Sequence, residues 1–361
     1  MVKNAYIHIP FCKSKCNYCS FISYSMLEFK EEYLYALEKE IKHFYEQEPL
    51  DTLYIGGGTP SVLSVSELEA IIKRFVFEPN AEITVELNPE TLTYDYLSGL
   101  KNAGVNRISL GCQTFNDEIL VHIGRRHNAK QVIEAVRCAE NAGFENINLD
   151  FIYGLPSQNL SLFSNDLMQA MELGINHISL YGLKIDEGCY FYSHYPKNLP
   201  DNDMQADMYL MAIEILCGAG FEHYEISNFA KSGFASRHNL NYWNNNTYYG
   251  FGMAAHGYKD GCRYSNYEDF DRYLKFPRIH DLTHRLTEQE KLEEEIFLGF
   301  RKMSGIDIEK INQNFSIDFE KKYGKTLKKY LETKHIKKTE KGYKLSDNGI
   351  LVSNTILADF L

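Results

Sequence analysis

The sequence predicts an α/β fold in which six strand–helix pairs form a partial (β/α)6 barrel, followed by a small helical domain. Short apolar runs alternate with amphipathic helical stretches between residues 5 and 183, which is typical of parallel strands joined by right-handed crossovers. Polar residues recur where the strands end, and after about residue 286 the pattern changes. We expect a core barrel over 1–185, a segment over 186–285 that completes the barrel and carries a ligand, and a helical domain over 286–361.

The elements of the barrel can be taken in order. The first strand covers 5–10, and the helix over 29–41 that follows it has Tyr33, Leu34, Leu37 and Ile41 at helical spacing. Further strands are expected at 52–55, 83–87, 107–112, 147–152 and 177–183, separated by helical stretches such as 65–75 and 129–141. Beyond the sixth strand the pattern loosens, and a helix is expected over 203–217.

Composition and charge narrow the class of protein. The chain has 361 residues, 44% of them hydrophobic, and a formal net charge of −11, which predicts a folded globular protein. The start shows no apolar segment with a small-residue cleavage site, and no uncharged apolar run has the length of a membrane span, so we expect a cytoplasmic protein. The acidic balance argues against a nucleic-acid partner, because phosphate affinity needs a basic surface.

The loop after the first strand carries Cys12, Cys16 and Cys19 at the spacing C-x3-C-x2-C. This spacing points three thiolates at one small volume and favours an iron–sulfur cluster with one iron left open for a ligand. A zinc site is the alternative, but structural zinc needs four ligands, and no fourth cysteine or histidine follows at zinc-finger spacing. The other cysteines are scattered, as expected of buried thiols in a reducing compartment.

Polar residues also follow the later strands at their ends. Because the carboxyl ends of parallel strands meet at one rim, their recurrence predicts a ligand site built from the strand–helix loops. The glycine turn 56–58 lets backbone amides approach a ligand closely. Arg125 can pair with a carboxylate, although it can also be an arginine at a surface helix end. The other candidates at this rim are Gly57, Gly58, Thr59, Glu86, Gln113 and Asp150.

The segment 236–258 concentrates the only tryptophan, Trp243, together with His238, His256, several tyrosines and flexible glycines. A flat aromatic ligand would find stacking surfaces here, and a histidine could bind a metal at its centre. The alternative is that Trp243 and the tyrosines pack as part of a lid and that His238 hydrogen-bonds to the backbone.

The C-terminal domain is expected to be winged-helix-like. Thr287 and Glu290 have the spacing of a capping box at the start of a helix, a hairpin is expected over 336–345 with its turn at 341–342, and Ser346 is expected to cap a last helix. The stretch 321–344 is basic, but lysines at helical spacing are more often a solvated face than a DNA contact.

Five motifs occur in order along the chain: Tyr6-Ile-His-Ile-Pro-Phe-Cys12, Gly56-Gly-Gly-Thr-Pro60, Glu86-Leu-Asn-Pro89, Ser109-Leu-Gly-Cys-Gln113-Thr-Phe and Asp150-Phe-Ile-Tyr-Gly-Leu-Pro156. Their order and near spacing resemble the radical S-adenosylmethionine (SAM) proteins, in the branch similar to the oxygen-independent coproporphyrinogen III oxidase. The resemblance covers nearly the whole chain.

This resemblance implies a [4Fe-4S] cluster held by Cys12, Cys16 and Cys19, whose fourth iron takes the amino and carboxylate groups of SAM. It implies that one electron from the reduced cluster cleaves SAM to a 5′-deoxyadenosyl radical. It also implies a set of SAM-binding residues, namely Tyr6, Gly57, Gly58, Thr59, Glu86, Gln113, Arg125, Asp150 and Gly182.

Two departures separate the chain from the oxidase itself. The oxidase has a further cysteine where this chain has Phe21, and it has a longer segment before the first strand. With the motif His238-Asn-x-x-Tyr-Trp243, these departures resemble instead a group of heme chaperones in the same branch, which pass heme to acceptor hemoproteins, notably respiratory ones. The resemblance implies heme contacts at His238 and Trp243, with His256 and Cys262 as weaker candidates, and peripheral membrane contact through an acceptor. Coproporphyrinogen oxidase activity remains the alternative function but is not expected.

Overall fold

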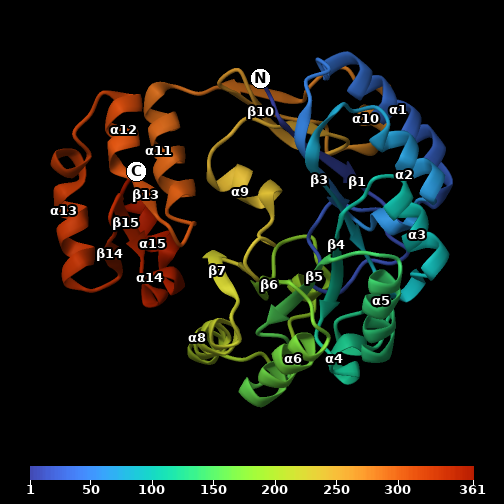
Figure 1. Ribbon diagram of the computed structural model, residues 1–361, viewed down its shortest axis with the longest axis horizontal. Helices are drawn as coiled ribbons and strands as arrows, with labels where there is room; N and C mark the ends of the chain where they lie inside the picture. The colour runs from blue at the N-terminus through green and yellow to red at the C-terminus, as the bar shows by residue number, and fades with distance from the viewer.

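The computed structural model describes residues 1–361, apart from the side chain of Thr91, and it has the predicted partial barrel with a separate C-terminal part (Figure 1). The strands of the main sheet are β1 (Asn4–Ile9), β2 (Leu50–Gly57), β3 (Phe77–Leu87), β4 (Arg107–Gln113), β5 (Asn146–Tyr153), β6 (His177–Gly182), β7 (Glu222–Glu225), β8 (Asn228–Ala230) and β9 (Tyr249–Phe251). The helices of this part are α1 (Lys30–Phe44), α2 (Val65–Ile72), α3 (Tyr94–Asn102), α4 (Asp117–His122), α5 (Ala129–Asn141), α6 (Leu160–Glu172), α7 (Tyr190–Ser193), α8 (Asn202–Gly218), α9 (Arg237–Trp243) and α10 (Phe270–Lys275).

Strand alternation separates the two faces of this sheet. In β4, Ile108 and Leu110 are fully buried in the apolar core, and the helices α1 to α6 lie outside the curved sheet (Figure 1). The intervening residue Ser109 instead bonds to Asp150 of the neighbouring strand. The period of two therefore places apolar side chains under the helices and polar side chains on the inner face, which we call the lumen.

The main sheet is larger than the six predicted strands. Its order among the described residues is β7-β8-β6-β5-β4-β3-β2-β1-β9. The strands β1 to β6 are parallel, β9 adds a parallel neighbour to β1, and β8 and β7 continue antiparallel beyond β6. The sequence does not reveal these three added strands because each has only three or four residues, too few for a periodic pattern.

A small antiparallel sheet, β10 (His256–Lys259), β11 (Cys262–Ser265) and β12 (Leu282–Arg285), follows β9. The C-terminal part then contains α11 (Glu288–Gly299), β13 (Ile306–Asp307), α12 (Ile308–Phe315), α13 (Phe319–Glu332), β14 (Ile336–Lys338), β15 (Gly342–Leu345), α14 (Asp347–Leu351) and α15 (Ser353–Ala358). Its strand order β13-β15-β14, with helices packed beside the small sheet, is winged-helix-like.

Details of the C-terminal part confirm some local predictions and correct one. The capping box of Thr287 and Glu290 is present at the start of α11, and Ser346 caps α14. The single last helix was wrong, because the chain departs from helical geometry at Val352, where φ is −116°, and the segment divides into α14 and α15. A separate apolar core that includes Phe300, Phe319 and Phe360 holds this part together.

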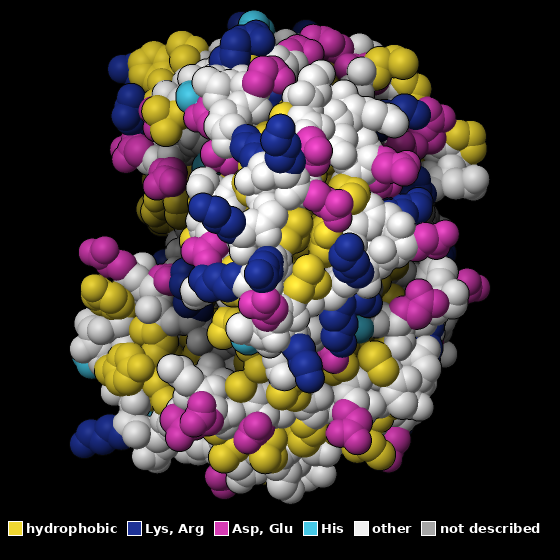
Figure 2. Space-filling view, turned by 90° about the vertical axis from the view of Figure 1, so that its left-hand side faces the viewer, with side chains coloured by type: hydrophobic (Ala, Val, Ile, Leu, Met, Phe, Trp, Pro, Cys, Tyr) yellow, Lys and Arg dark blue, Asp and Glu magenta, His cyan; other side chains and the backbone are white. Residues whose placement is uncertain are grey.

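The basic stretch of the C-terminal part is a solvated face. Figure 2 shows Lys and Arg side chains on this side of the molecule with Asp and Glu side chains among them. Lys329 pairs with Asp359 at 2.6 Å, and Lys338 lies 3.8 Å from Glu320. Exposed pairs of this kind contribute little to stability. No helix among the described residues combines the length and apolar composition needed to cross a bilayer.

Candidate functional site

The cysteine loop begins where β1 ends and is closed at its base by the backbone. The amide of Cys12 donates to the carbonyl of Tyr24 at 2.9 Å, and the amide of Tyr24 donates to the carbonyl of Pro10 at 2.7 Å. In mid-loop, Asn17 donates from its backbone amide to Ile123 at 3.0 Å and from its side chain to the carbonyl of His122 at 2.8 Å. These bonds fix the loop against the end of α4.

All three cysteines of this loop are free and partly exposed. The Sγ of Cys12 lies 3.3 Å from Thr59 Oγ1, and the Sγ of Cys16 accepts from Arg125 Nη1 at 3.5 Å. Among the described residues, no three His, Cys, Asp or Glu side chains are arranged to hold a single metal ion. A cubane cluster binds each thiolate at a different iron and therefore holds the sulfurs farther apart.

The glycine turn lies against the base of the cysteine loop. The amide of Gly58 donates to Ile9 O at 2.8 Å, and the amide of Thr59 donates to Phe11 O at 2.7 Å. A Cβ on Gly58 would lie 2.6 Å from Phe11 O, and Gly57 has a φ of +113°. Glycine is required at both positions, because a side chain would push the turn away from the loop.

Two carboxyl groups face the lumen beside this turn. Glu86 accepts from the Tyr54 hydroxyl at 2.8 Å and from the Gly57 amide at 3.0 Å. Burial, with the nearby charge of Asp150 as a further cause, raises the pKa of Glu86 to about 7. Asp150 accepts from Ser109 Oγ at 2.9 Å, and burial raises its pKa as well. A buried ammonium group or ribose hydroxyls would find acceptors here.

Arg125 extends from the loop after α4 across the rim. Its Nη2 donates to Asn88 Oδ1 at 2.7 Å and to the carbonyl of Gly111 at 2.8 Å, and Asn88 Nδ2 in turn donates to Thr59 Oγ1 at 3.0 Å. The Nε of Arg125 is buried and has no hydrogen-bond partner among the described residues. Gln113, at a bulge of β4, has a φ of +69°, an uncommon conformation that clusters at ligand sites.

The remaining SAM candidates occupy the same rim at different depths. Tyr6 OH bonds to His8 Nδ1 at 3.1 Å, and His8 Nε2 bonds to Ile22 O in the cysteine loop at 2.9 Å. Since the carbonyl can only accept, His8 Nε2 donates and His8 Nδ1 accepts from Tyr6. Gly182 ends β6 beside Tyr153, and none of the described hydrogen bonds joins it to the other candidates.

The residues at this rim fit a cluster with a bound ligand. Three partly exposed thiols lie on one fixed loop, the half-buried Arg125 has a buried donor to spare, and two half-buried carboxyls lie beside a close glycine turn. A carboxylate could pair with the guanidinium while an ammonium group meets the carboxyls. The donor set therefore suits a zwitterionic amino acid group next to an iron–sulfur cluster.

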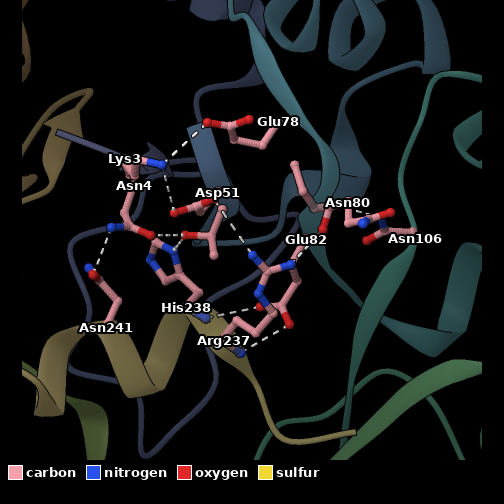
Figure 3. Close-up of polar contacts among 12 residues, drawn as sticks. Lys3, Asn4, Asp51, Glu78, Asn80, Glu82, Asn106, Arg237, His238 and Asn241 are labelled. Atoms are coloured by element: carbon pink, nitrogen blue, oxygen red, sulfur yellow. Dashed lines mark hydrogen bonds and ion pairs between the residues drawn. The ribbon is translucent and has the colours of Figure 1, made fainter. Parts of the chain in front are cut away.

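His238 lies apart from this rim, deep in the lumen. It is 1% exposed, its Nδ1 bonds to Thr52 Oγ1 at 2.7 Å, and its Nε2 bonds to Tyr242 OH at 2.9 Å. Figure 3 shows His238 and Asn241 of α9 and Asn4 of β1 directed toward one another. Burial lowers the pKa of His238 to about 3, with the charge of Arg107 as a further cause. His238 is therefore a neutral imidazole with both ring nitrogens hydrogen-bonded to side chains.

Trp243 lies on a different side of α9. With Tyr242, Tyr248, Arg263 and Leu298, it lines a cavity of about 330 Å³ between α9, the small sheet and α11. The Arg301 guanidinium lies 5.6 Å from its ring centroid. No contact joins Trp243 to His238 among the described residues. Tyr242 bonds to His238 and also lines the cavity that contains Trp243.

Several site residues have no role assigned from the sequence. Asn88 joins Thr59 to Arg125, Tyr54 holds Glu86, and Tyr242 covers His238. Arg107 is 2% exposed, its Nε has no partner among the described residues, and its charge affects the lumen histidines. The sequence contained a signal for two of these residues. Asn88 directly follows a strand, which places it on the rim, and Arg107 has the period-two position of a side chain that faces the lumen.

Comparisons with known proteins agree with this geometry. Residues 6–168 match the Radical SAM superfamily, and residues 286–352 match the HemN C-terminal domain. The solved structure of the coproporphyrinogen III oxidase HemN from Escherichia coli, a radical SAM enzyme, is similar with a TM-score of 0.88 over 99% of this chain and 90% of that chain. At 23% identity this likeness shows the fold alone. The match of residues 6–168 to the superfamily model identifies the chain as a radical SAM protein.

Two relatives align with this chain over almost its full length. The heme chaperone HemW of Lactococcus lactis is 40% identical over 99% of this chain and 97% of its own length, and that of Bacillus subtilis is 38% identical over 100% and 99%. The chain belongs to the HemW family of the radical SAM superfamily. The predicted family is confirmed, and membership of the superfamily implies a [4Fe-4S] cluster and SAM.

Proposed function

We propose that this protein binds heme and transfers it to acceptor hemoproteins, with respiratory hemoproteins as the expected class. The proposal rests on the kinship with heme chaperones over the full length. Its supporting observation in the structure is the cavity of about 330 Å³ that Trp243 and two tyrosines line. A flat porphyrin edge could stack against these rings, and Arg263 could pair with a carboxylate of the ligand. Any membrane contact would come through the acceptor.

We further propose that Cys12, Cys16 and Cys19 hold a [4Fe-4S] cluster and that the rim binds SAM. When bound, the cluster supplies one-electron reduction at an open iron. The chain's own residues bind and orient the ligand: Arg125 offers donors to a carboxylate, Glu86 and Asp150 accept from an ammonium group or hydroxyls, and Gly57 and Gly58 keep the turn close. Tyr6, Thr59, Gln113 and Gly182 complete this proposed set.

Heme titration of the cluster-reconstituted protein tests the first proposal. We expect a Soret band, a shifted spectrum in His238→Ala, and transfer of heme to an apo-hemoprotein. The variant with alanine at Cys12, Cys16 and Cys19 shows whether heme binding depends on the cluster. Absence of a Soret band in the reconstituted wild type would rule the proposal out.

The rival activity is oxidation of coproporphyrinogen III. Phe21, which stands where the oxidase has a further cysteine, is 67% exposed on the cysteine loop. Anaerobic incubation with SAM, a reductant and coproporphyrinogen III should release no CO2 beyond the background of the triple alanine variant. Release of CO2 at the rate of a control oxidase would favour the rival.

A further inference from the structure

The protonation of His238 follows from its hydrogen bonds. Asn4 Nδ2 donates to Asn241 Oδ1 at 2.7 Å and to the carbonyl of Thr247 at 3.4 Å. Because a carbonyl only accepts, the second contact orients the amide, and Asn4 Oδ1 accepts from Thr52 Oγ1 at 2.9 Å. A hydroxyl has one hydrogen, so Thr52 Oγ1 is left to accept from His238 Nδ1 at 2.7 Å. The Nδ1 of His238 therefore carries the hydrogen.

The other ring nitrogen, Nε2, then carries the lone pair of a neutral imidazole. It accepts from Tyr242 OH at 2.9 Å. No carboxylate is hydrogen-bonded to either ring nitrogen among the described residues, since Glu82 meets this helix through the backbone amides of Arg237 and His238 instead. A histidine whose Nδ1–H is held by an acceptor while Nε2 is free of hydrogen has the orientation and tautomer of a metal ligand.

Tyr242 lies between this lone pair and the cavity. Its ring packs edge-on against His238 at 4.9 Å and against Tyr248 at 4.7 Å. It also lines the cavity that contains Trp243. The side chain of Tyr242 is thus the wall that separates the cavity from the Nε2 of His238.

We propose that Tyr242 is a displaceable cap: heme enters the cavity beside Trp243, and Tyr242 turns away so that the His238 Nε2 lone pair reaches the iron. Thr52 is the positioning residue that keeps the hydrogen on Nδ1. This inference rests on the proposed heme binding and adds that Tyr242 covers the Nε2 of His238 until heme binds. No covalent bond of the protein breaks, because one hydrogen bond is exchanged for one bond from nitrogen to iron.

The hydrogen bond between Tyr242 and His238 should lower the apparent affinity for heme by a measurable factor. While the tyrosine is bonded to His238, the state that can bind iron is a minor population, and the apparent affinity falls by that fraction. Removal of one neutral hydrogen bond raises that population about fivefold. We expect Tyr242→Phe to bind heme about fivefold faster or more tightly than the wild type, with the same final spectrum.

The test has one arm without heme and one with it. In the heme-free protein, ¹⁵N NMR of His238 should show hydrogen on Nδ1 in the wild type and Tyr242→Phe, and a mixture of tautomers in Thr52→Val. In the second arm, stopped-flow heme binding compares Tyr242→Phe with the wild type and with Tyr96→Phe, whose hydroxyl bonds to Leu63 O far from the cavity. Tyr96→Phe should bind heme at the wild-type rate.

The outcomes separate the cap from the function. If His238→Ala shifts the heme spectrum but Tyr242→Phe binds at the wild-type rate, the cap is wrong and the function stands. If heme binds with the same spectrum in His238→Ala, His238 is not the ligand and both the ligand assignment and the cap fail. Hydrogen on Nε2 in the heme-free wild type would overturn the tautomer and, with it, the cap.

Discussion

Glu40 of α1 offers a sharp test of how the barrel is held together. It is completely buried and accepts from Tyr273 OH at 2.6 Å, Asn266 Nδ2 at 2.6 Å and the Gly252 amide at 2.9 Å. These bonds tie the first helix to the loops after β9 and β11 and to α10. Because burial outweighs the three donors, the pKa of Glu40 is raised from its ordinary 4.5 to about 7.

The raised pKa of Glu40 determines in which direction the free energy of unfolding changes with pH. Between pH 4.5 and 7 the folded protein holds a proton on Glu40 that the unfolded chain has released. The stabilisation that this proton uptake gives is complete below the unfolded pKa of Glu40 and is lost as the pH rises through 7. A pKa difference of about 2.5 corresponds to about 3 kcal/mol at about 1.4 kcal/mol per unit. Relative to Glu40→Gln, which cannot titrate, the wild type should lose about 3 kcal/mol of unfolding free energy over this range.

Urea denaturation followed by circular dichroism at several pH values from 4.5 to 8 measures this difference. The control is Glu69→Gln, which removes an exposed i,i+4 pair with Lys73 and should show no pH-dependent difference from the wild type. A difference between wild type and Glu40→Gln that stays constant or grows in favour of the wild type with rising pH would refute the reasoning. Glu40→Ala leaves three buried donors unpaired and should cost about 3 kcal/mol or more at any pH.

Three further changes test the site. Cys16→Ala should abolish the visible absorption and iron content of the anaerobically reconstituted protein, whereas loading equal to the wild type would contradict the ligand assignment. Gly57→Ala places a Cβ 2.6 Å from the ring of His8 at a φ of +113°, so SAM affinity by calorimetry should fall about tenfold or more, and an unchanged affinity would mean that the turn does not contact SAM. Asp166→Ala removes the acceptor of the Thr114 hydroxyl at 2.8 Å and should lower the unfolding free energy from urea denaturation by about 2 kcal/mol, with an unchanged unfolding free energy as the contrary result.

The rim was predictable from the sequence because parallel strands carry their carboxyl ends to one edge. Glu86 and Asp150 lie toward the carboxyl ends of strands whose apolar residues alternate clearly, so their common position needed no knowledge of side-chain contacts. The period of two also placed Arg107 in the lumen. Its lack of a hydrogen-bonded partner at Nε could not be read from any pattern, since partners come from strands far apart in the sequence.

The surroundings of His238 show where sequence reasoning ends. Its ring nitrogens meet Thr52 and Tyr242, and only the second partner lies on the same helix face, at i+4. The sequence left open whether His238 bonds to the backbone or binds a metal. The structure instead finds a side-chain network that includes β1, β2 and α9, which depends on where β9 returns the chain to the sheet.

The position of β9 has a consequence for synthesis of the chain. Residues 5–7 of β1 pair with residues 249–251 of β9, so the strand that leads into the cysteine loop gains its second neighbour only after most of the barrel has left the ribosome. Until then β1 is an open sheet edge, the kind of edge that attracts other strands. Long-range pairing of this kind also forms slowly. The cysteine loop therefore gains its complete frame late in synthesis, and nascent chains that end before residue 249 expose the edge beside the three cysteines.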